Sequence, residues 1–351
     1  MTQAKLLAVQ TGVPDYCYSQ NQIAEFYVQL LGERGKRRER AIHNIMHQSG
    51  VEFRYSAVEP SFFATEKSTQ QRNDIYMQEA VPLGARVIRA GLEKAGVEAK
   101  QIDTFIVVSC TGLSIPGLDL LLAGQLGMRS NLSRTCVLGM GCYGAFPGMR
   151  RAMESVVQQP NRLALVLALE LCTLHQQFDD AVETVVSTSL FADGAAMLLL
   201  GTTASPGSPR FIDAETYCDY QTLDHMAFKV TDQGFRMYLS SYVPDVLAAN
   251  VSDFVQRLLV RNDLQPEDVR FWAIHPGSQR IVEYIQEQLA LSAEQVKPSL
   301  DILKAYGNMS SATVLFVLDR IMQMELPQPG DYGVMMAFGP GLTMESMLVQ
   351  W

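Results

Sequence analysis

Cys142 is the first residue of this 351-residue sequence whose type and surroundings suit covalent chemistry. It lies in the segment LGMGCYGAFPG (138–148), where glycines on both sides allow a tight bend between a strand and a helix. A thiol at a helix N-terminus is expected to have a lowered pKa and to be nucleophilic near neutral pH. The alternative is a small buried cysteine in a glycine-rich turn.

His275 and Asn308 could complete the chemistry of such a thiol. His275 ends the apolar run FWAIH, so its imidazole is expected at the carboxyl edge of a sheet, where it could accept a thiol proton. Asn308 is expected to be a helix N-cap or an amide donor to a developing oxyanion. Papain-like hydrolases use these residue types in the same order, but the CGSCW-type signature of that class is missing from the sequence.

The elements that must position these residues alternate between buried strands and amphipathic helices. Apolar, β-branched runs predict strands at 5–13, 104–110, 134–140, 162–171, 194–201, 269–275, 332–339 and 342–350. Helical periodicity predicts helices at 20–31, 75–95, 116–126, 143–157, 243–260, 278–289 and 310–324. This alternation predicts an α/β protein.

The spacing of the candidate residues indicates an internal duplication. Cys142 follows Cys110, the end of one strand, by 32 residues, and Asn308 follows His275, the end of another, by 33 residues. Two similar halves would bring these positions to one face. A turn-rich segment at 201–210 predicts the junction, so the expected halves are residues 1–205 with the cysteine and 206–351 with the histidine and asparagine.

Composition limits the classes of function and partner. The chain has 28 basic and 37 acidic residues, a formal net charge of −9, which argues against nucleic acid or an anionic membrane surface as the main partner. The apolar run 163–169 is too short to span a membrane, and the N-terminus has no export signal, so we expect a cytoplasmic protein. Six cysteines without a CxxC pair and five scattered histidines predict no metal site.

Five motifs together resemble those of type III polyketide synthases, in the chalcone/stilbene synthase superfamily and of the bacterial type. They are GMGCYGAFPG (139–148), SLFADGAA (189–196), WAIHPG (272–277), YGNMSSAT (306–313) and AFGPGLTMES (337–346), and the match extends from about residue 4 to the C-terminus. The resemblance implies a duplicated, five-layered αβαβα thiolase-like fold and a homodimer. It also implies iterative decarboxylative condensation of malonyl-CoA onto an acyl-CoA starter, then cyclisation to a resorcinol, pyrone or similar product, without a cofactor beyond the CoA thioesters.

The same resemblance assigns roles to individual residues. It implies that Cys142 is the acyl-accepting nucleophile, that His275 and Asn308 stabilise a thioester enolate, and that Phe191 is a gatekeeper between the CoA tunnel and the reaction chamber. Ile115 is expected to reach into the partner subunit's cavity. The other implied substrate-binding residues are Met237, Phe228, Cys110, His175, Ser310, Gly339, Pro340 and Gly341. Phe228 and His175 replace smaller residues of the plant enzymes and are expected to reduce or redirect the chamber.

The basic cluster RGKRRER (34–40) suggests a site for the CoA phosphates, although a solvated helix start is the alternative. The implied CoA-binding residues are Arg38, Arg40, His47 and Gly277. Two other functions stay open at this point. A ketoacyl-ACP synthase III-like enzyme would condense once, and a scaffold subunit of the same fold would be inactive; the GPG-containing C-terminal loop and the intact triad argue against them.

Overall fold

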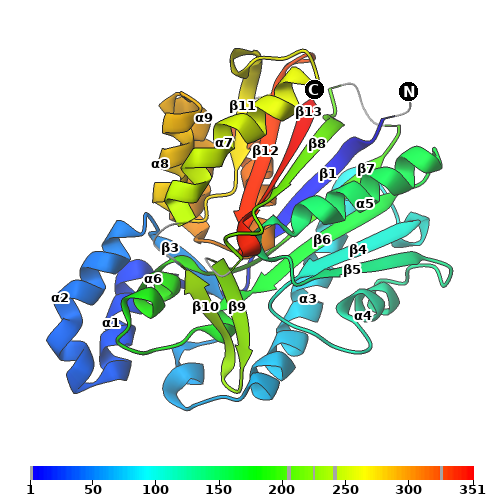
Figure 1. Ribbon diagram of the computed structural model, residues 1–351. Coiled ribbons are helices and arrows are strands. Elements are labelled where there is room, and N and C mark those ends of the chain that lie inside the picture. The colour runs from blue at the N-terminus through cyan, green and yellow to red at the C-terminus, as the bar shows by residue number, and fades with distance from the viewer. Residues whose placement is uncertain (1–2, 204–206, 224–225, 240–242, 325–326) are drawn as a thin grey trace.

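In the computed structural model, the chain is described over residues 3–203, 207–223, 226–239, 243–324 and 327–351. Among these residues, nine strands form one sheet (Figure 1). In sheet order they are β11 (Val269–Ile274), β12 (Tyr332–Gly339), β13 (Thr343–Gln350), β8 (Arg210–Cys218), β1 (Lys5–Gly12), β7 (Asp193–Gly201), β6 (Ala164–Leu171), β4 (Thr104–Ser109) and β5 (Ser133–Leu138).

The sheet consists of two similar halves, which meet where Lys5 of β1 pairs with Arg210 of β8. In the first half, β1 and β6 each lie antiparallel to β7, and β4 lies parallel to β6. The second half repeats this pattern, because β8 and β12 lie antiparallel to β13 and β11 lies parallel to β12. Only β5, parallel to β4, has no counterpart among the described strands. This topology confirms the predicted duplication.

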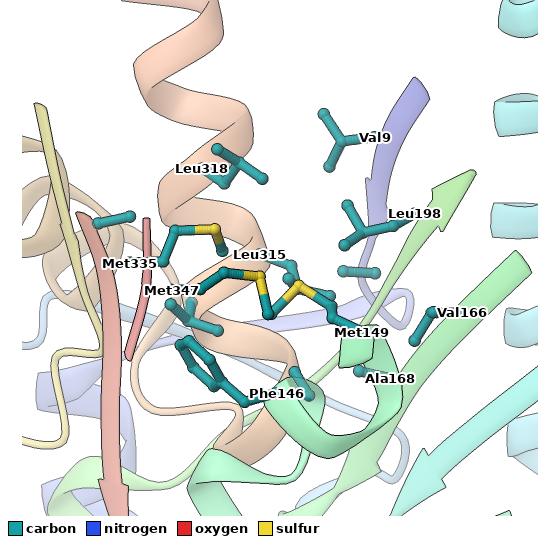
Figure 2. Close-up of a cluster of buried hydrophobic side chains, with 14 of the residues drawn as sticks. Val9, Phe146, Met149, Val166, Ala168, Leu198, Leu315, Leu318, Met335 and Met347 are labelled. Carbon is teal, nitrogen blue, oxygen red and sulfur yellow. The ribbon is translucent and has the colours of Figure 1, made fainter. Parts of the chain in front are cut away.

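Two central helices lie between the halves of the sheet, α5 (Ala145–Gln158) and α10 (Thr313–Met324). Their apolar side chains, including Met149 and Leu315, pack with Val166 of the first half and Met335 of the second in one continuous core (Figure 2). A single core of this kind stabilises both halves at once, because neither half buries this apolar face without the other.

Outer helices complete the five layers of the predicted αβαβα fold. α3 (Thr69–Ala95) and α4 (Leu118–Gln125) cover the outer face of the first half, and α7 (Val243–Val260), α8 (Gln279–Gln288) and α9 (Ala293–Tyr306) cover that of the second. Ser68 begins α3 and Ser292 begins α9, each in a capping box with a glutamine three residues later. None of the described helices is both long enough and apolar enough to cross a bilayer.

The remaining elements surround the end of the sheet where Cys142 and Asn308 lie. They are β2 (Tyr16–Ser19), β3 (Phe53–Ser56), the helices α1 (Gln20–Leu31), α2 (Glu33–Gln48) and α6 (Val182–Leu190), and the hairpin of β9 (Met226–Thr231) and β10 (Gly234–Leu239). α2 carries the basic cluster predicted to start a helix. The predicted boundary between the halves, at residues 205 and 206, falls within positions 204–206, which lie outside the described residues. It therefore stays a prediction.

Candidate active site

The turn that holds Cys142 depends on glycine. Cys142 is the middle residue of a short 3-10 helix, Gly141–Tyr143, which leads into α5. Gly139 and Gly141 have φ angles of 70° and 68°, a region that disfavours side chains. A Cβ at Gly141 would also lie only 2.6 Å from Pro340 Cδ. The glycine therefore allows the C-terminal loop to close over the cysteine, which is 5% exposed.

His275 lies directly after β11, with its backbone N–H bonded to Met336 O of β12 at 2.8 Å. The ring is buried, and within the described part of the chain neither Nδ1 nor Nε2 has a hydrogen-bond partner. A Cβ at Gly277 would lie 3.7 Å from Nε2, so this glycine leaves space beside the imidazole. Two unpartnered buried nitrogens are costly unless a ligand or water uses them.

Asn308 is fixed by hydrogen bonds of both its backbone and its side chain, which connect it to the segment around Phe191 and to Gly277. Its N–H donates to Leu190 O at 2.8 Å, and its carbonyl accepts from Ala192 N–H at 2.9 Å, so it is fixed beside Phe191. The amide Nδ2 donates to Gly277 O at 3.2 Å, while Oδ1 accepts from Ser310 N–H at 2.8 Å. These bonds orient the amide group, which leaves its second N–H available as a donor.

The thiol and the imidazole are both neutral at neutral pH in this environment. Burial raises the pKa of Cys142 to about 11, although hydrogen bonds from Ser310 and Asn308 favour the thiolate. Burial lowers the pKa of His275 to about 3. The prediction of a lowered thiol pKa from the helix N-terminus is therefore wrong. Loss of hydration destabilises the thiolate more than the hydrogen bonds from Ser310 and Asn308 stabilise it. A neutral imidazole is the form that can accept the thiol proton.

Glu170 is a feature of the site that sequence reasoning did not assign. It is fully buried near the end of β6, and its Oε2 accepts from Cys110 N–H at 2.9 Å and from the Thr111 hydroxyl at 2.7 Å. Its Oε1 accepts from the Ser311 hydroxyl. Burial raises the pKa of Glu170, while these donors act to lower it. The sequence did carry a signal for this residue, because a charged Glu170 directly follows the apolar run 163–169 of a predicted buried strand.

A narrow cavity of about 40 Å³ lies beside this site. The predicted substrate-binding residues in its wall are Cys110, His175, Phe191, Phe228, Met237 and Ser310. The rings of Phe191 and Phe228 meet edge to face with centroids 5.8 Å apart, and Met237 pairs with Phe228 across the β9–β10 hairpin. Cys142 packs in the same apolar cluster as Phe191. The described residues contain no group of three or more His, Cys, Asp or Glu side chains placed to hold a metal ion.

Comparison with known proteins identifies the family. The family models for the N-terminal and C-terminal domains of chalcone and stilbene synthases match residues 1–204 and 216–351. The chain belongs to this family. The synthase is 31% identical to 1,3,6,8-tetrahydroxynaphthalene synthase of Streptomyces peucetius subsp. caesius, over 98% of this chain and 92% of that protein. It is 32% identical to the alpha-pyrone synthesis polyketide synthase-like Pks18 of Mycobacterium tuberculosis, over 99% and 91%.

A solved structure supports the same assignment. PKS-I from the brown alga Ectocarpus siliculosus matches the synthase with a TM-score of 0.93 at 29% identity, covering 99% of this chain and 98% of that one. The chain is a type III polyketide synthase and therefore an acyltransferase, and its fold is thiolase-like. These similarities do not favour a single-condensation enzyme or an inactive scaffold.

His175 of the synthase lines the cavity but has no free nitrogen. Its Nε2 donates to Thr111 O at 2.7 Å, and its Nδ1 accepts from Phe235 N–H at 3.2 Å. The ring stacks on Phe235 with centroids 4.0 Å apart. Burial lowers the pKa of His175 to about 4, so the ring is neutral and ties the β9–β10 hairpin to the loop after β4. This position narrows the chamber mainly by packing.

The other predicted residues of the synthase occupy four places. The Gly339–Pro340–Gly341 loop borders the turn that holds Cys142, since a Cβ at Gly339 would lie 3.3 Å from Cys142 N. Ile115 is 94% exposed on the loop after β4 and is not one of the described residues that line the narrow cavity. The proposed CoA-binding side chains Arg38, Arg40 and His47 are exposed on α2, where Arg38 donates to the backbone carbonyl of Asp180, while Gly277 lies beside His275.

Proposed function

We propose that Cys142, His275 and Asn308 carry the condensation chemistry of this synthase. The observation that carries the proposal is the pair of unpartnered His275 nitrogens beside an amide that is fixed by hydrogen bonds to Gly277 and Ser310. Polar groups buried in this way are ready to bind a substrate oxygen. The starter is an acyl-CoA and the extender is malonyl-CoA, and we propose no metal or redox cofactor.

The first step transfers the starter acyl group to sulfur. The neutral imidazole of His275 accepts the proton of the Cys142 thiol as the sulfur attacks the acyl-CoA carbonyl. The tetrahedral intermediate collapses when the C–S bond to CoA breaks. CoA leaves with the proton returned from the imidazolium, and an acyl thioester remains on Cys142.

The second step makes the carbon nucleophile. Malonyl-CoA loses its free carboxylate as CO₂, and the electron pair of the broken C–C bond becomes a thioester enolate. N–H groups of His275 and Asn308 donate to the enolate oxygen, where negative charge develops. The enolate carbon attacks the acyl thioester, a new C–C bond forms, and Cys142 leaves as a thiolate. Transfer of the lengthened chain back to Cys142 allows repetition.

The products that we propose are resorcinols, pyrones or similar small rings. Cyclisation inside a cavity requires that water be excluded from the reactive polyketone, and Phe191, Phe228 and Met237 supply apolar walls for this. Phe228 limits the number of extensions because its ring meets Phe191 across the chamber. Gly339, Pro340 and Gly341 shape the side of the chamber next to the nucleophile.

We propose that the synthase is a cytoplasmic homodimer. Ile115 is 94% exposed, and Leu113 on the same loop is 56% exposed. The neighbouring strand β5 is an edge strand whose Leu138 is 46% exposed. Exposed apolar side chains on a loop beside an open strand edge are typical of a surface that another subunit covers. Arg38, Arg40 and His47 on α2, with Gly277, are proposed to bind CoA.

The test is product analysis of wild-type protein and Cys142→Ala with malonyl-CoA and a panel of acyl-CoA starters. Mass spectrometry should detect triketides or longer products from the wild type and none from the variant. Polyketides from Cys142→Ala at the wild-type rate would refute the nucleophile assignment. Products limited to one condensation would instead support the ketoacyl-ACP synthase III-like alternative.

A further inference from the structure

A second cavity, which the proposed mechanism does not use, lies on the other side of Gln176. This aromatic cavity has a volume of about 210 Å³, several times that of the reaction chamber. Its principal wall residues are Ile23, Phe26, Phe63, Phe178, Arg54 and Gln176. An apolar cavity of roughly 150 Å³ is enough to hold benzene. The aromatic cavity can therefore hold one substituted six-membered ring.

The walls of the aromatic cavity favour a planar ring. Phe178 contacts Phe26 edge to face with centroids 5.8 Å apart and contacts Phe63 with centroids 5.1 Å apart. The ring centroids of Phe26 and Phe63 lie 6.4 Å apart, so the three rings pack together as one aromatic wall of the cavity. Faces and edges of aromatic rings attract one another in these orientations. An inserted aromatic ring would extend the existing cluster.

The aromatic cavity also has a cationic wall residue with spare donors. Arg54 is 2% exposed, and within the described chain its Nε and Nη2 have no hydrogen-bond partner. Its Nη1 is used, because it donates to Thr188 O and to Phe191 O. A buried guanidinium with unused N–H groups favours a ligand that brings an acceptor oxygen.

Two wall residues connect the aromatic cavity to the gate of the reaction chamber. Arg54 Nη1 donates to the backbone carbonyl of Phe191 at 3.0 Å, and Gln176 Nε2 lies 3.4 Å from the same oxygen. Gln176 lines both cavities. A ligand that draws either donor toward itself would loosen the backbone that positions the Phe191 ring beside Cys142.

We propose that the aromatic cavity is a second binding site, for a single-ring aromatic molecule that carries an acceptor oxygen, and that its occupancy alters access to Cys142 through Phe191. The walls of this site differ from those of the reaction chamber except at Gln176, which lines both. Its existence does not depend on the proposed chemistry of Cys142, because binding is measured directly.

The probe is resorcinol, titrated into the wild-type protein by calorimetry. A ligand of this size is expected to bind in about the millimolar range. Ile23→Trp adds bulk to the aromatic cavity and should weaken binding at least about tenfold. The matched control is Ile45→Trp, since Ile45 is partly buried in the same helix pair but outside the cavity wall. Phe63→Leu, a milder change, should weaken binding by up to about tenfold.

The second measurement is the rate at which iodoacetamide alkylates Cys142, followed by mass spectrometry. Saturating resorcinol should change this rate in the wild type and in Ile45→Trp, but not in Ile23→Trp. Absence of saturable binding, or unchanged binding to folded Ile23→Trp and Phe63→Leu, would overturn the site. Binding that leaves the alkylation rate of the wild type unchanged would overturn the connection to Phe191.

Discussion

Replacement of His275 by glutamine should lower the alkylation rate of Cys142, because without the proposed base the thiol forms very little thiolate. Burial and the negative charge of Glu170 raise the pKa of Cys142 to about 11, while hydrogen bonds from Ser310 and Asn308 act to lower it. At pH 7 such a thiol is ionised in about one molecule in 10⁴. General-base assistance contributes about 10²- to 10⁴-fold, so His275→Gln should lower the alkylation rate at pH 7 by a factor in that range.

The assay is iodoacetamide alkylation of the Cys142 peptide, measured by mass spectrometry between pH 6 and pH 10, because other cysteines also react. In His275→Gln the rate should rise about tenfold for each pH unit without a plateau, since the thiolate fraction rises until the pKa is reached. His47→Gln is the control, because it removes an exposed imidazole on α2. A neutral-pH plateau in His275→Gln, at a rate close to that of the wild type, would refute the role of His275.

Three further changes test other parts of the site. Asn308→Ala removes the proposed enolate donor and should slow malonyl-CoA decarboxylation about 10²- to 10³-fold, measured as CO₂ release; an unchanged rate would reject the donor role. Phe228→Ala opens the chamber beside Phe191 and should shift products toward longer polyketides by mass spectrometry, whereas an identical product profile would show that this ring does not limit extension. Glu170→Leu leaves the Cys110 N–H and the hydroxyls of Thr111 and Ser311 without this acceptor and should lower the free energy of unfolding by at least about 3 kcal/mol in urea titrations, so a wild-type midpoint would contradict the network.

Sequence patterns predicted the elements that build the frame of the site. The expected strand at 162–171 is β6, and the helix expected at 20–31 is α1 with the same bounds. The duplication was visible because the spacing from a strand end to the next candidate residue is nearly equal in the two halves, 32 residues from Cys110 to Cys142 and 33 from His275 to Asn308. The strand at 134–140 was predicted as buried, yet Leu138 of β5 is 46% exposed. An apolar run does not distinguish a central strand from an edge strand.

Other features depend on contacts between distant segments. α9 was not predicted, because Pro298 lies inside it and proline usually interrupts a helix. The environment of Cys142 follows from burial by the C-terminal loop, which is almost 200 residues away in sequence. Likewise, His175 was expected in the cavity wall, but its bonds to Thr111 and Phe235 are visible only when three segments are packed together.

The shared core around α5 and α10 has a consequence for the synthesis of the chain on the ribosome. The first half emerges carrying Cys142, while the imidazole proposed as its base is still untranslated. Until β11 and α10 dock, the thiol has no proton acceptor from the second half, and the apolar face of α5 stays uncovered. On the proposed mechanism, the condensation that uses His275 and Asn308 therefore begins only after the whole chain has folded, whereas the hydrated thiol of the nascent chain ionises more readily than the buried one.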